Sequence, residues 1–156
     1  MLSDKDIKKF LDENNVWYNF IAKPETVHTA DAAALTGIPL EKLTKSLTLL
    51  DENKNPVLAI IPGNKKLDYK KLRQALNVKK VRMVAFDDSV NYSGYLPGAT
   101  PMVNHKLKMR VVLDKSLTSY ESIFGGGGAR DKILELKTED VISLNNAIVA
   151  DITSND

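Results

Sequence analysis

Lys45 is the side chain of this 156-residue sequence best placed to act on a ligand. The sequence predicts a strand at residues 46–50, where polar and apolar residues alternate, and a short helical turn just before it. A lysine at such a junction has a rigidly held backbone and an ammonium group that is free to reach into a cleft. The simpler interpretation is a solvated surface lysine, because lysine is rarely buried and usually has no special role.

The residues upstream of this strand supply a second polar group, His28. Thr29 is predicted to cap a helix that begins near Ala30 and ends at Gly37. Pro39 suits the first turn of a second short helix, since the amide that proline lacks is unpaired there anyway. An unperturbed imidazole titrates near ~6.5, so His28 is a candidate general base, although a histidine before a helix is equally suited to a structural hydrogen bond.

Two glycine-rich segments, at residues 94–101 and 125–128, are candidate walls of a pocket, because glycine lets the backbone approach a ligand closely. The first also contains two prolines, which exclude a helix interior or a central strand. The second is not a phosphate-binding Walker motif, because no Gly-Lys-Ser/Thr follows it, and it lacks the context of a dinucleotide fingerprint. The simpler interpretation of both segments is an ordinary turn.

Composition excludes several kinds of site. The chain has no cysteine, which rules out disulfides, a thiolate nucleophile and any zinc site built on cysteine. Its two histidines, His28 and His105, are far apart in sequence, so we expect no metal and no other cofactor. No apolar run approaches the ~18 residues of a membrane helix, and the N-terminus lacks the apolar core of a signal peptide. We therefore expect a cofactor-free protein of the cytoplasm.

Positive charge is concentrated in one segment, although the net charge is only +2. Residues 65–82 hold eight Lys or Arg against one Asp, a local charge of +7, which leaves −5 for the rest of the chain. This asymmetry is typical of a surface that faces a polyanion. The cations proposed for that surface are Lys65, Lys66, Lys70, Lys71 and Arg73. The alternative is a solvated helix face.

The elements that position these residues follow one another without a repeat or a linker. Helices are predicted in residues 1–15, 30–36, 69–76 and 138–144, and strands in residues 16–21, 46–50, 57–61, 79–85, 109–113, 121–124, 133–136 and 147–152. Residues 1–156 are thus predicted to form one α+β domain, with a mixed, strongly curved sheet or barrel flanked by short helices. The tail, residues 153–156, is expected to be frayed.

The order of these segments resembles the YbaK and proline-tRNA-synthetase-associated domain family, whose members hydrolyse mischarged aminoacyl-tRNA. The resemblance covers roughly residues 16–152. The matching motifs are His28-Thr29, Ala32-Ala33-Ala34-Leu35, Gly37, Leu43-Thr44-Lys45-Ser46-Leu47, Ile60-Ile61-Pro62-Gly63 with Leu67-Asp68, and Gly94-Tyr95-Leu96 followed by Gly98 and Pro101.

The resemblance implies a YbaK-like fold and a catalytic role for Lys45. It implies a substrate-binding role for His28, Thr44, Gly94, Tyr95, Pro97, Gly98, Gly126 and Gly127. Two departures leave the substrate open. Pro97 stands where relatives vary, and the turn that begins at Gly125 lacks the histidine that some alanine-specific relatives carry.

The function that the resemblance implies is a metal-independent trans-editing hydrolase, which cleaves the ester of tRNA mischarged with a small amino acid such as Cys, Ala, Ser or Pro. Its expected partner is the tRNA acceptor end, with an aminoacyl-tRNA synthetase as a further candidate and no membrane. Two alternatives fit the same residues. One is a non-catalytic module of the same fold that binds tRNA or another RNA, and the other is a hydrolase of small aminoacyl esters that ignores tRNA.

Overall fold

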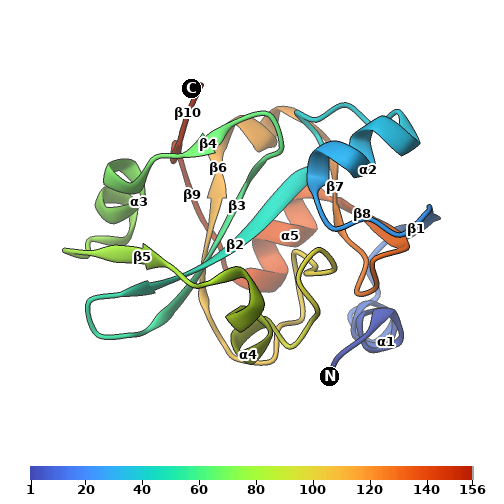
Figure 1. Cartoon of the computed structure of the whole chain (residues 1–156), viewed down its shortest axis with the longest axis horizontal. Coiled ribbons are helices and arrows are strands. Elements are labelled where there is room, and N and C mark those ends of the chain that lie inside the picture. The colour runs from blue at the N-terminus through green and yellow to red at the C-terminus, as the bar shows by residue number, and fades with distance from the viewer. Residues whose placement is uncertain (156) are drawn as a thin grey trace.

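Three β-sheets and five short α-helices make up residues 1–155, the part of the chain that the computed structural model describes (Figure 1). The helices lie around the sheets and are not layered on one side of them. This arrangement confirms the predicted α+β class.

The largest sheet has the strand order β5-β2-β3-β6-β9. Its strands are β2 (Thr44–Asp51), β3 (Pro56–Pro62), β5 (Val81–Met83), β6 (Arg110–Asp114) and β9 (Ile148–Ala150). Strands β2 and β3 form the predicted antiparallel hairpin, whereas β6 pairs in parallel with both β3 and β9. The sheet is therefore mixed, as predicted.

The second sheet is antiparallel and has the order β1-β8-β7. Its strands are β1 (Tyr18–Ala22), β7 (Ser122–Gly126) and β8 (Lys132–Lys137). One bridge, between Leu43 and Phe124, joins β7 to the start of β2. A third sheet pairs β4 (Lys66–Leu67) with β10 (Thr153–Ser154). Across residues 1–155 these pairings form no closed barrel, so the barrel in our prediction is not confirmed.

The helices are α1 (Asp4–Glu13), α2 (Thr29–Thr36), α3 (Tyr69–Leu76), α4 (Val90–Ser93) and α5 (Thr138–Asn145), with two 3-10 turns, η1 (Phe86–Asp88) and η2 (Lys115–Ser119). Helix α3 begins and ends where predicted. The Asp68 carboxylate accepts a hydrogen bond from the Lys71 backbone amide at 3.0 Å, and Asn77 takes a left-handed φ of 56°. None of the helices in residues 1–155 is long and apolar enough to span a membrane.

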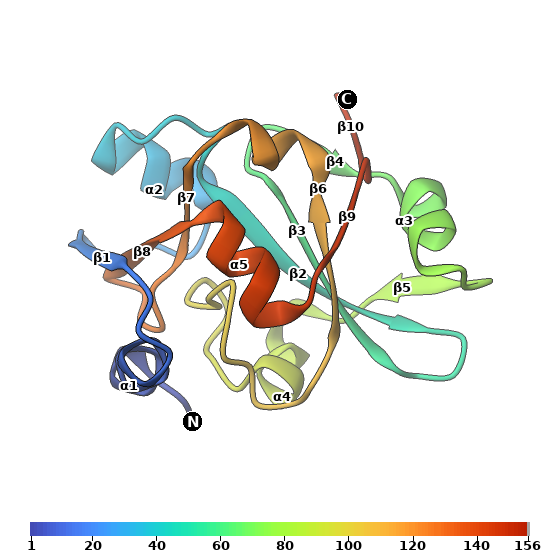
Figure 2. The ribbon, with the colours of Figure 1, turned by 180° about the vertical axis from the view of Figure 1, so that it is seen from behind.

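Strand β3 is buried on both faces and separates two apolar cores. Leu58 and Ile60 point into a core shared with α1, α5 and the β7–β8 hairpin, while Val57 and Ile61 point into a second core beneath α3. Figure 2 shows α5 crossing the back of the molecule between β8 and β9. Burial on both faces explains why β3 is a continuous apolar run and does not alternate.

The segment that leads into β2 differs from our prediction. Thr29 is the first residue of α2 and not its cap, although Gly37 ends the helix with the expected left-handed φ of 75°. The second short helix is absent. Pro39 instead opens a turn in which the Leu43 amide donates to its carbonyl at 3.1 Å. The bridge from Leu43 to Phe124 explains this, because it draws the chain into the sheet before a helix can form.

Two later predictions also need correction. Gly125 and Gly126 continue β7 and pair with β8, so only the second half of the glycine run is a turn. The chain end at Thr153–Ser154 is not frayed, because it pairs with β4, and the Thr153 hydroxyl donates to the buried Asp114 carboxylate at 3.2 Å. Asp156 lies outside the described residues.

Candidate active site

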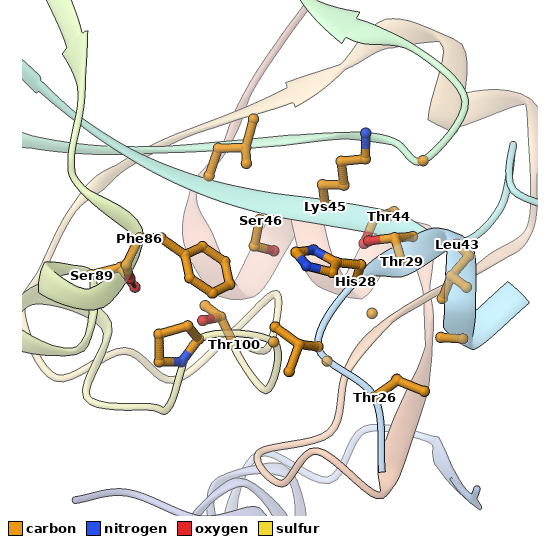
Figure 3. Close-up of a pocket in the computed structure, with 18 of the residues that line it drawn as sticks. Thr26, His28, Thr29, Leu43, Thr44, Lys45, Ser46, Phe86, Ser89 and Thr100 are labelled. Atoms are coloured by element: carbon orange, nitrogen blue, oxygen red, sulfur yellow. Dashed lines mark hydrogen bonds between the residues drawn. The ribbon is translucent and has the colours of Figure 1, made fainter. Parts of the chain in front are cut away.

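A cavity of about 490 Å³ opens where the edge of β2, the segment before α2 and the two glycine-rich segments meet (Figure 3). Its ionisable lining residues are Lys23, His28, Lys45 and Lys132. Six of the nine residues predicted to be catalytic or substrate-binding line it, namely Lys45, His28, Thr44, Pro97, Gly98 and Gly126. The fold therefore gathers most of the predicted residues in one place.

The edge of β2 supplies unpaired polar groups to this cavity. Strand β5 pairs with β2 only from residue 49 to residue 51, and the Val84 amide adds one bond to the Thr48 carbonyl at 3.0 Å. Backbone groups of alternate residues point to the same side of a strand, so the N–H and C=O of Ser46 face the same side as those of Thr48, where no strand remains to pair them. The Ser46 hydroxyl is buried and has no hydrogen-bond partner in residues 1–155.

Thr44, by contrast, is already engaged. Its hydroxyl donates to the Phe124 carbonyl at 2.9 Å, which ties the start of β2 to β7. We therefore assign Thr44 to the wall of the cavity, where its side chain holds two strands together.

Lys45 carries the free ammonium of the cavity. No ion pair with Lys45 forms among residues 1–155. Figure 3 shows its side chain leaving β2 on the side away from Ser46 and His28, so that the strand edge separates the ammonium from the imidazole. Lys45 lies within β2 and not at a helix-to-strand junction, and the pairing of β2 with β3 holds its backbone.

His28 precedes α2 with an extended backbone, and its ring stacks on Phe86. The ring centroids are 6.2 Å apart and the ring planes are inclined by 30°. The Phe86 side chain comes from η1, on the other side of the cavity. Among residues 1–155, no group of three or more His, Asp or Glu side chains is placed to hold a metal ion.

Two glycines let the loops around the cavity approach one another. Gly98 has a left-handed φ of 87°, and a Cβ atom there would lie 2.8 Å from the backbone of Val27. A Cβ atom on Gly126 would lie 2.2 Å from the Thr100 carbonyl oxygen. A larger residue at position 98 would push this loop away from the segment before α2. A larger residue at position 126 would push β7 away from the loop that contains Thr100.

Lys23 and Arg130 lock these segments together. The Lys23 ammonium donates to the Arg130 carbonyl and to the Thr26 hydroxyl, the second at 2.6 Å. The Arg130 guanidinium donates through Nε to the Pro97 carbonyl at 2.8 Å. Burial lowers the pKa of Lys23, and the charges of nearby carboxylates offset this only in part. The ammonium is thus held by neutral acceptors and acts as a bridge between loops.

Lys132, the other lysine of the lining, is ion-paired. Its ammonium lies 2.6 Å from the Asp4 carboxylate at the start of α1. This bond raises the pKa of Lys132 and lowers that of Asp4. It fastens the N-terminal helix to β8 beside the cavity.

Three predicted substrate-binding residues lie outside the cavity lining. Tyr95 is fully buried in the core, where its hydroxyl donates to the Asn104 carbonyl at 2.8 Å and burial raises its pKa. Gly94 packs against Leu2, and Gly127 packs against the backbone of Lys132. These residues shape the loops around the cavity, and their contact with a ligand stays a prediction.

The predicted tRNA-binding cations form a separate region. Lys66 lies on β4, three more lie on α3, and Lys65 lies just before β4, whereas none of the five lines the cavity. In Figure 1, α3 and α2 are at opposite ends of the molecule. Lys71 differs from the others, because its ammonium donates to Asp151 at 3.0 Å and to the Thr153 carbonyl at 2.9 Å.

Among the lining residues that were not proposed from the sequence are Lys23, Ser46, Phe86 and Lys132. The sequence did contain a signal for Ser46, because Thr44, Ser46 and Thr48 are polar residues at alternate positions of one strand and so share a face. For Phe86 there was none, because η1 meets the segment before α2 only in the folded chain.

A comparison with protein families matches residues 23–144 to the model of the aminoacyl-tRNA editing domain. A protein of Enterococcus faecalis named "Putative Cys-tRNA(Pro)/Cys-tRNA(Cys) deacylase EbsC" is 31% identical over 137 residues, which are 88% of this chain and 84% of that protein. A proline–tRNA ligase of Geobacter sp. is 25% identical over 138 residues, which cover 84% of this chain but only 24% of the ligase. The crystal structure of the hypothetical protein APE2540 superimposes with a TM-score of 0.89 at 26% identity, over 96% of this chain and 99% of that one.

Proposed function

The chain belongs to the aminoacyl-tRNA editing domain family, and from this premise we propose that it acts in trans to hydrolyse the ester of tRNA mischarged with a small amino acid. The observation that carries the proposal is the single cavity that joins Lys45, the free edge of β2 and both glycine-rich segments. Cysteine, alanine, serine and proline are the candidate amino acids. Cysteine ranks first, because the Enterococcus relative is named for Cys-tRNA.

The reaction does not require a nucleophilic side chain of the protein, because an aminoacyl ester is intrinsically labile. Water attacks the ester carbonyl, the bond to the ribose oxygen breaks, the ribose oxygen takes up a proton, and the amino acid leaves as a carboxylic acid. The site must position the water and stabilise the negative charge that develops on the carbonyl oxygen. From the family resemblance, we propose that the neighbouring ribose hydroxyl of the substrate helps to activate the water.

Lys45 supplies the positive charge in this mechanism. Lys45 lines the cavity, and its ammonium is free of ion pairs among residues 1–155. It would reach the terminal phosphate or the reacting ester from the side of β2 away from His28. The backbone amides of Gly98 and Gly126 are the candidate donors to the carbonyl oxygen. Donors of this kind act strongly because they are fixed before the charge appears.

We propose that hydrolysis needs no metal, since the lining offers ammonium groups, hydroxyls and amides to the reacting ester. The cations Lys65, Lys66, Lys70 and Arg73 are proposed to contact the acceptor stem, and Lys71 shares this face. A synthetase is a further proposed partner, because a related domain occurs within proline–tRNA ligases. The expected compartment is the cytoplasm, where tRNA is charged.

The test is release of labelled amino acid from tRNAs mischarged with cysteine, alanine, serine or proline, in the presence of EDTA. Wild type should hydrolyse at least one of them, and Lys45→Ala should lower kcat by about a hundredfold or more, the usual cost of removing one stabilising group from a transition state. Lys9→Ala, on the exposed side of α1, is the matched control and should keep full activity.

Three other results would contradict the proposed function or its mechanism. Full activity of Lys45→Ala would remove this lysine from the mechanism. Salt-sensitive tRNA binding without hydrolysis of any substrate would favour the non-catalytic RNA-binding module. Cleavage of short esters but not of tRNA would favour a small-ester hydrolase.

A further inference from the structure

Two aromatic side chains lie at the cavity with no role in the apolar core. Phe86 is 51% exposed and belongs to neither of the two large cores that flank β3. It stacks on the exposed ring of His28. A single exposed phenylalanine needs no explanation, but two exposed rings in contact across a cavity form an aromatic surface that is open to a ligand.

The backbone on which both rings are carried is fixed without a ligand. The Phe86 carbonyl accepts a hydrogen bond from the Ser89 hydroxyl at 2.8 Å, which closes η1. On the opposite side, His28 follows Val27, whose backbone packs against Gly98. A surface that is ordered before binding loses little conformational entropy when a ligand stacks on it.

Unpaired polar groups lie beside the rings. Figure 3 shows Ser46 pointing from β2 to the side of the strand that carries His28 and Phe86. Its hydroxyl is buried without a partner in the described chain, and its N–H and C=O face the free strand edge. A buried polar group without a partner costs free energy that a ligand with matching ring nitrogens would recover.

We infer that Phe86 and His28 form the stacking surface for the terminal adenine of tRNA, with Ser46 hydrogen-bonding the edge of that nucleoside. The inference rests on the proposed function and extends it to base recognition. A purine has the flat π-face that the rings require and both donors and acceptors on its edge, which is how enzymes commonly read an unpaired base. The aminoacyl group is then left to the glycine-lined part of the cavity.

The test compares two esters that differ in the presence of the base. Phe86→Ala and Phe86→Leu should lower kcat/KM on Cys-tRNA(Pro) by about tenfold to a hundredfold, the range that alanine substitution of a stacking residue gives. Phe86→Tyr should retain activity because it keeps the ring. None of the three should change hydrolysis of the cysteinyl ester of ribose 5-phosphate, which keeps the ribose hydroxyl but has no adenine. Leu107→Ala, at a residue that is 40% exposed and outside the cavity, is the surface control.

A binding measurement separates this inference from the proposed activity. Adenosine 5′-monophosphate and ribose 5-phosphate are titrated into wild type and Phe86→Ala and followed by amide NMR shifts. Wild type should bind adenosine 5′-monophosphate more tightly than ribose 5-phosphate. Phe86→Ala should lower the affinity for the nucleotide to that for the sugar phosphate.

Equal binding of the two probes to wild type, or full turnover of Cys-tRNA(Pro) by Phe86→Leu, would overturn the stacking surface while leaving deacylation intact. Absence of hydrolysis by wild type together with a preference for the nucleotide that depends on Phe86 would overturn the deacylase and support the base-binding surface.

Discussion

The cavity and the basic face of α3 are both rich in lysine, and they use it in different ways. In the cavity, two of three lysines are committed to the fold, Lys23 by carbonyl and hydroxyl oxygens and Lys132 by Asp4. Of these three lysines, only Lys45 has neither an ion pair nor a side-chain hydrogen bond among residues 1–155.

The proportions are reversed on β4 and α3. There Lys71 is tied to Asp151, whereas Lys66 and Lys70 project into solvent without a salt bridge among residues 1–155. One free ammonium on a rigid strand is suited to contacting one particular group of a bound substrate. Several free charges on an exposed helix are suited to a diffuse field along a nucleic-acid backbone. We therefore expect the hydrogen-bond partner of each lysine, and not the local charge density, to distinguish a structural lysine from one that contacts the substrate.

The largest effect on stability that this comparison predicts comes from a lysine to which we assign no chemical step. Lys23→Met should lower the free energy of unfolding by about 1–3 kcal/mol, because the charged hydrogen bonds to Thr26 and Arg130 are lost. It should also lower kcat/KM for mischarged tRNA by about tenfold or more, since misplaced catalytic groups are costly. Urea denaturation and the deacylation assay measure the two effects.

Lys9→Met is the control for the loss of one lysine, and it should change neither quantity, because Lys9 is exposed on α1. A Lys23→Met protein of normal stability and normal turnover would show that the loops hold their positions without this bridge, and the distinction between tied and free lysines would fail in the cavity.

The basic face should affect binding and leave the chemical step unchanged. Replacing Lys66, Lys70 and Arg73 by Gln should reduce the dependence of log Kd for tRNA on log salt by about 2, since each phosphate contact contributes about 0.7–0.9 to that slope. Hydrolysis of a short aminoacyl ester should be unaffected. The matched control replaces Lys5, Lys8 and Lys9 of α1, which removes the same charge from another exposed helix. An equal loss of salt dependence in both triple variants would mean that net charge, and not this face, attracts tRNA.

The elements that could be predicted from sequence are those with local signals. Asp68 and Asn77 mark the two ends of α3 within a few residues, and the β2–β3 hairpin has a short polar turn. The contacts that make the cavity are not local. The Lys23 ammonium bonds to a carbonyl 107 residues away, and nothing near Lys23 in the sequence indicates it.

Tyr95 and Phe86 also show that the sequence did not indicate which aromatic residues line the cavity. The motif around Gly94 suggested a ligand contact for Tyr95, but the packing of the loop buries its ring completely. Phe86 follows an unremarkable strand and becomes a cavity residue because η1 turns it toward His28. Which aromatic residue of a loop faces a ligand depends on loop packing, and this is fixed by tertiary contacts that sequence periodicity does not encode.

The smallest expected effect distinguishes the two ion-paired lysines, Lys132 and Lys71, from each other. The Asp4 side chain in the pair with Lys132 is 25% exposed, whereas Asp151 in the pair with Lys71 is 63% exposed and therefore better screened by water. Asp4→Asn should lower the free energy of unfolding by about 1 kcal/mol at pH 7. Asp151→Asn should leave it close to the wild-type value.

The pH dependence identifies the source of the Asp4 effect. The bond to Lys132 lowers the pKa of Asp4, so its stabilisation is fully present above the pKa of an unfolded aspartate, near ~3.9, and disappears as the pH falls through the lower folded value. The difference between wild type and Asp4→Asn in urea denaturation should therefore shrink steadily below about pH 4. A difference that persists unchanged at pH 2 would mean that Asp4 acts through packing of α1. In that case Lys132 would count as a second free cation of the cavity, beside Lys45.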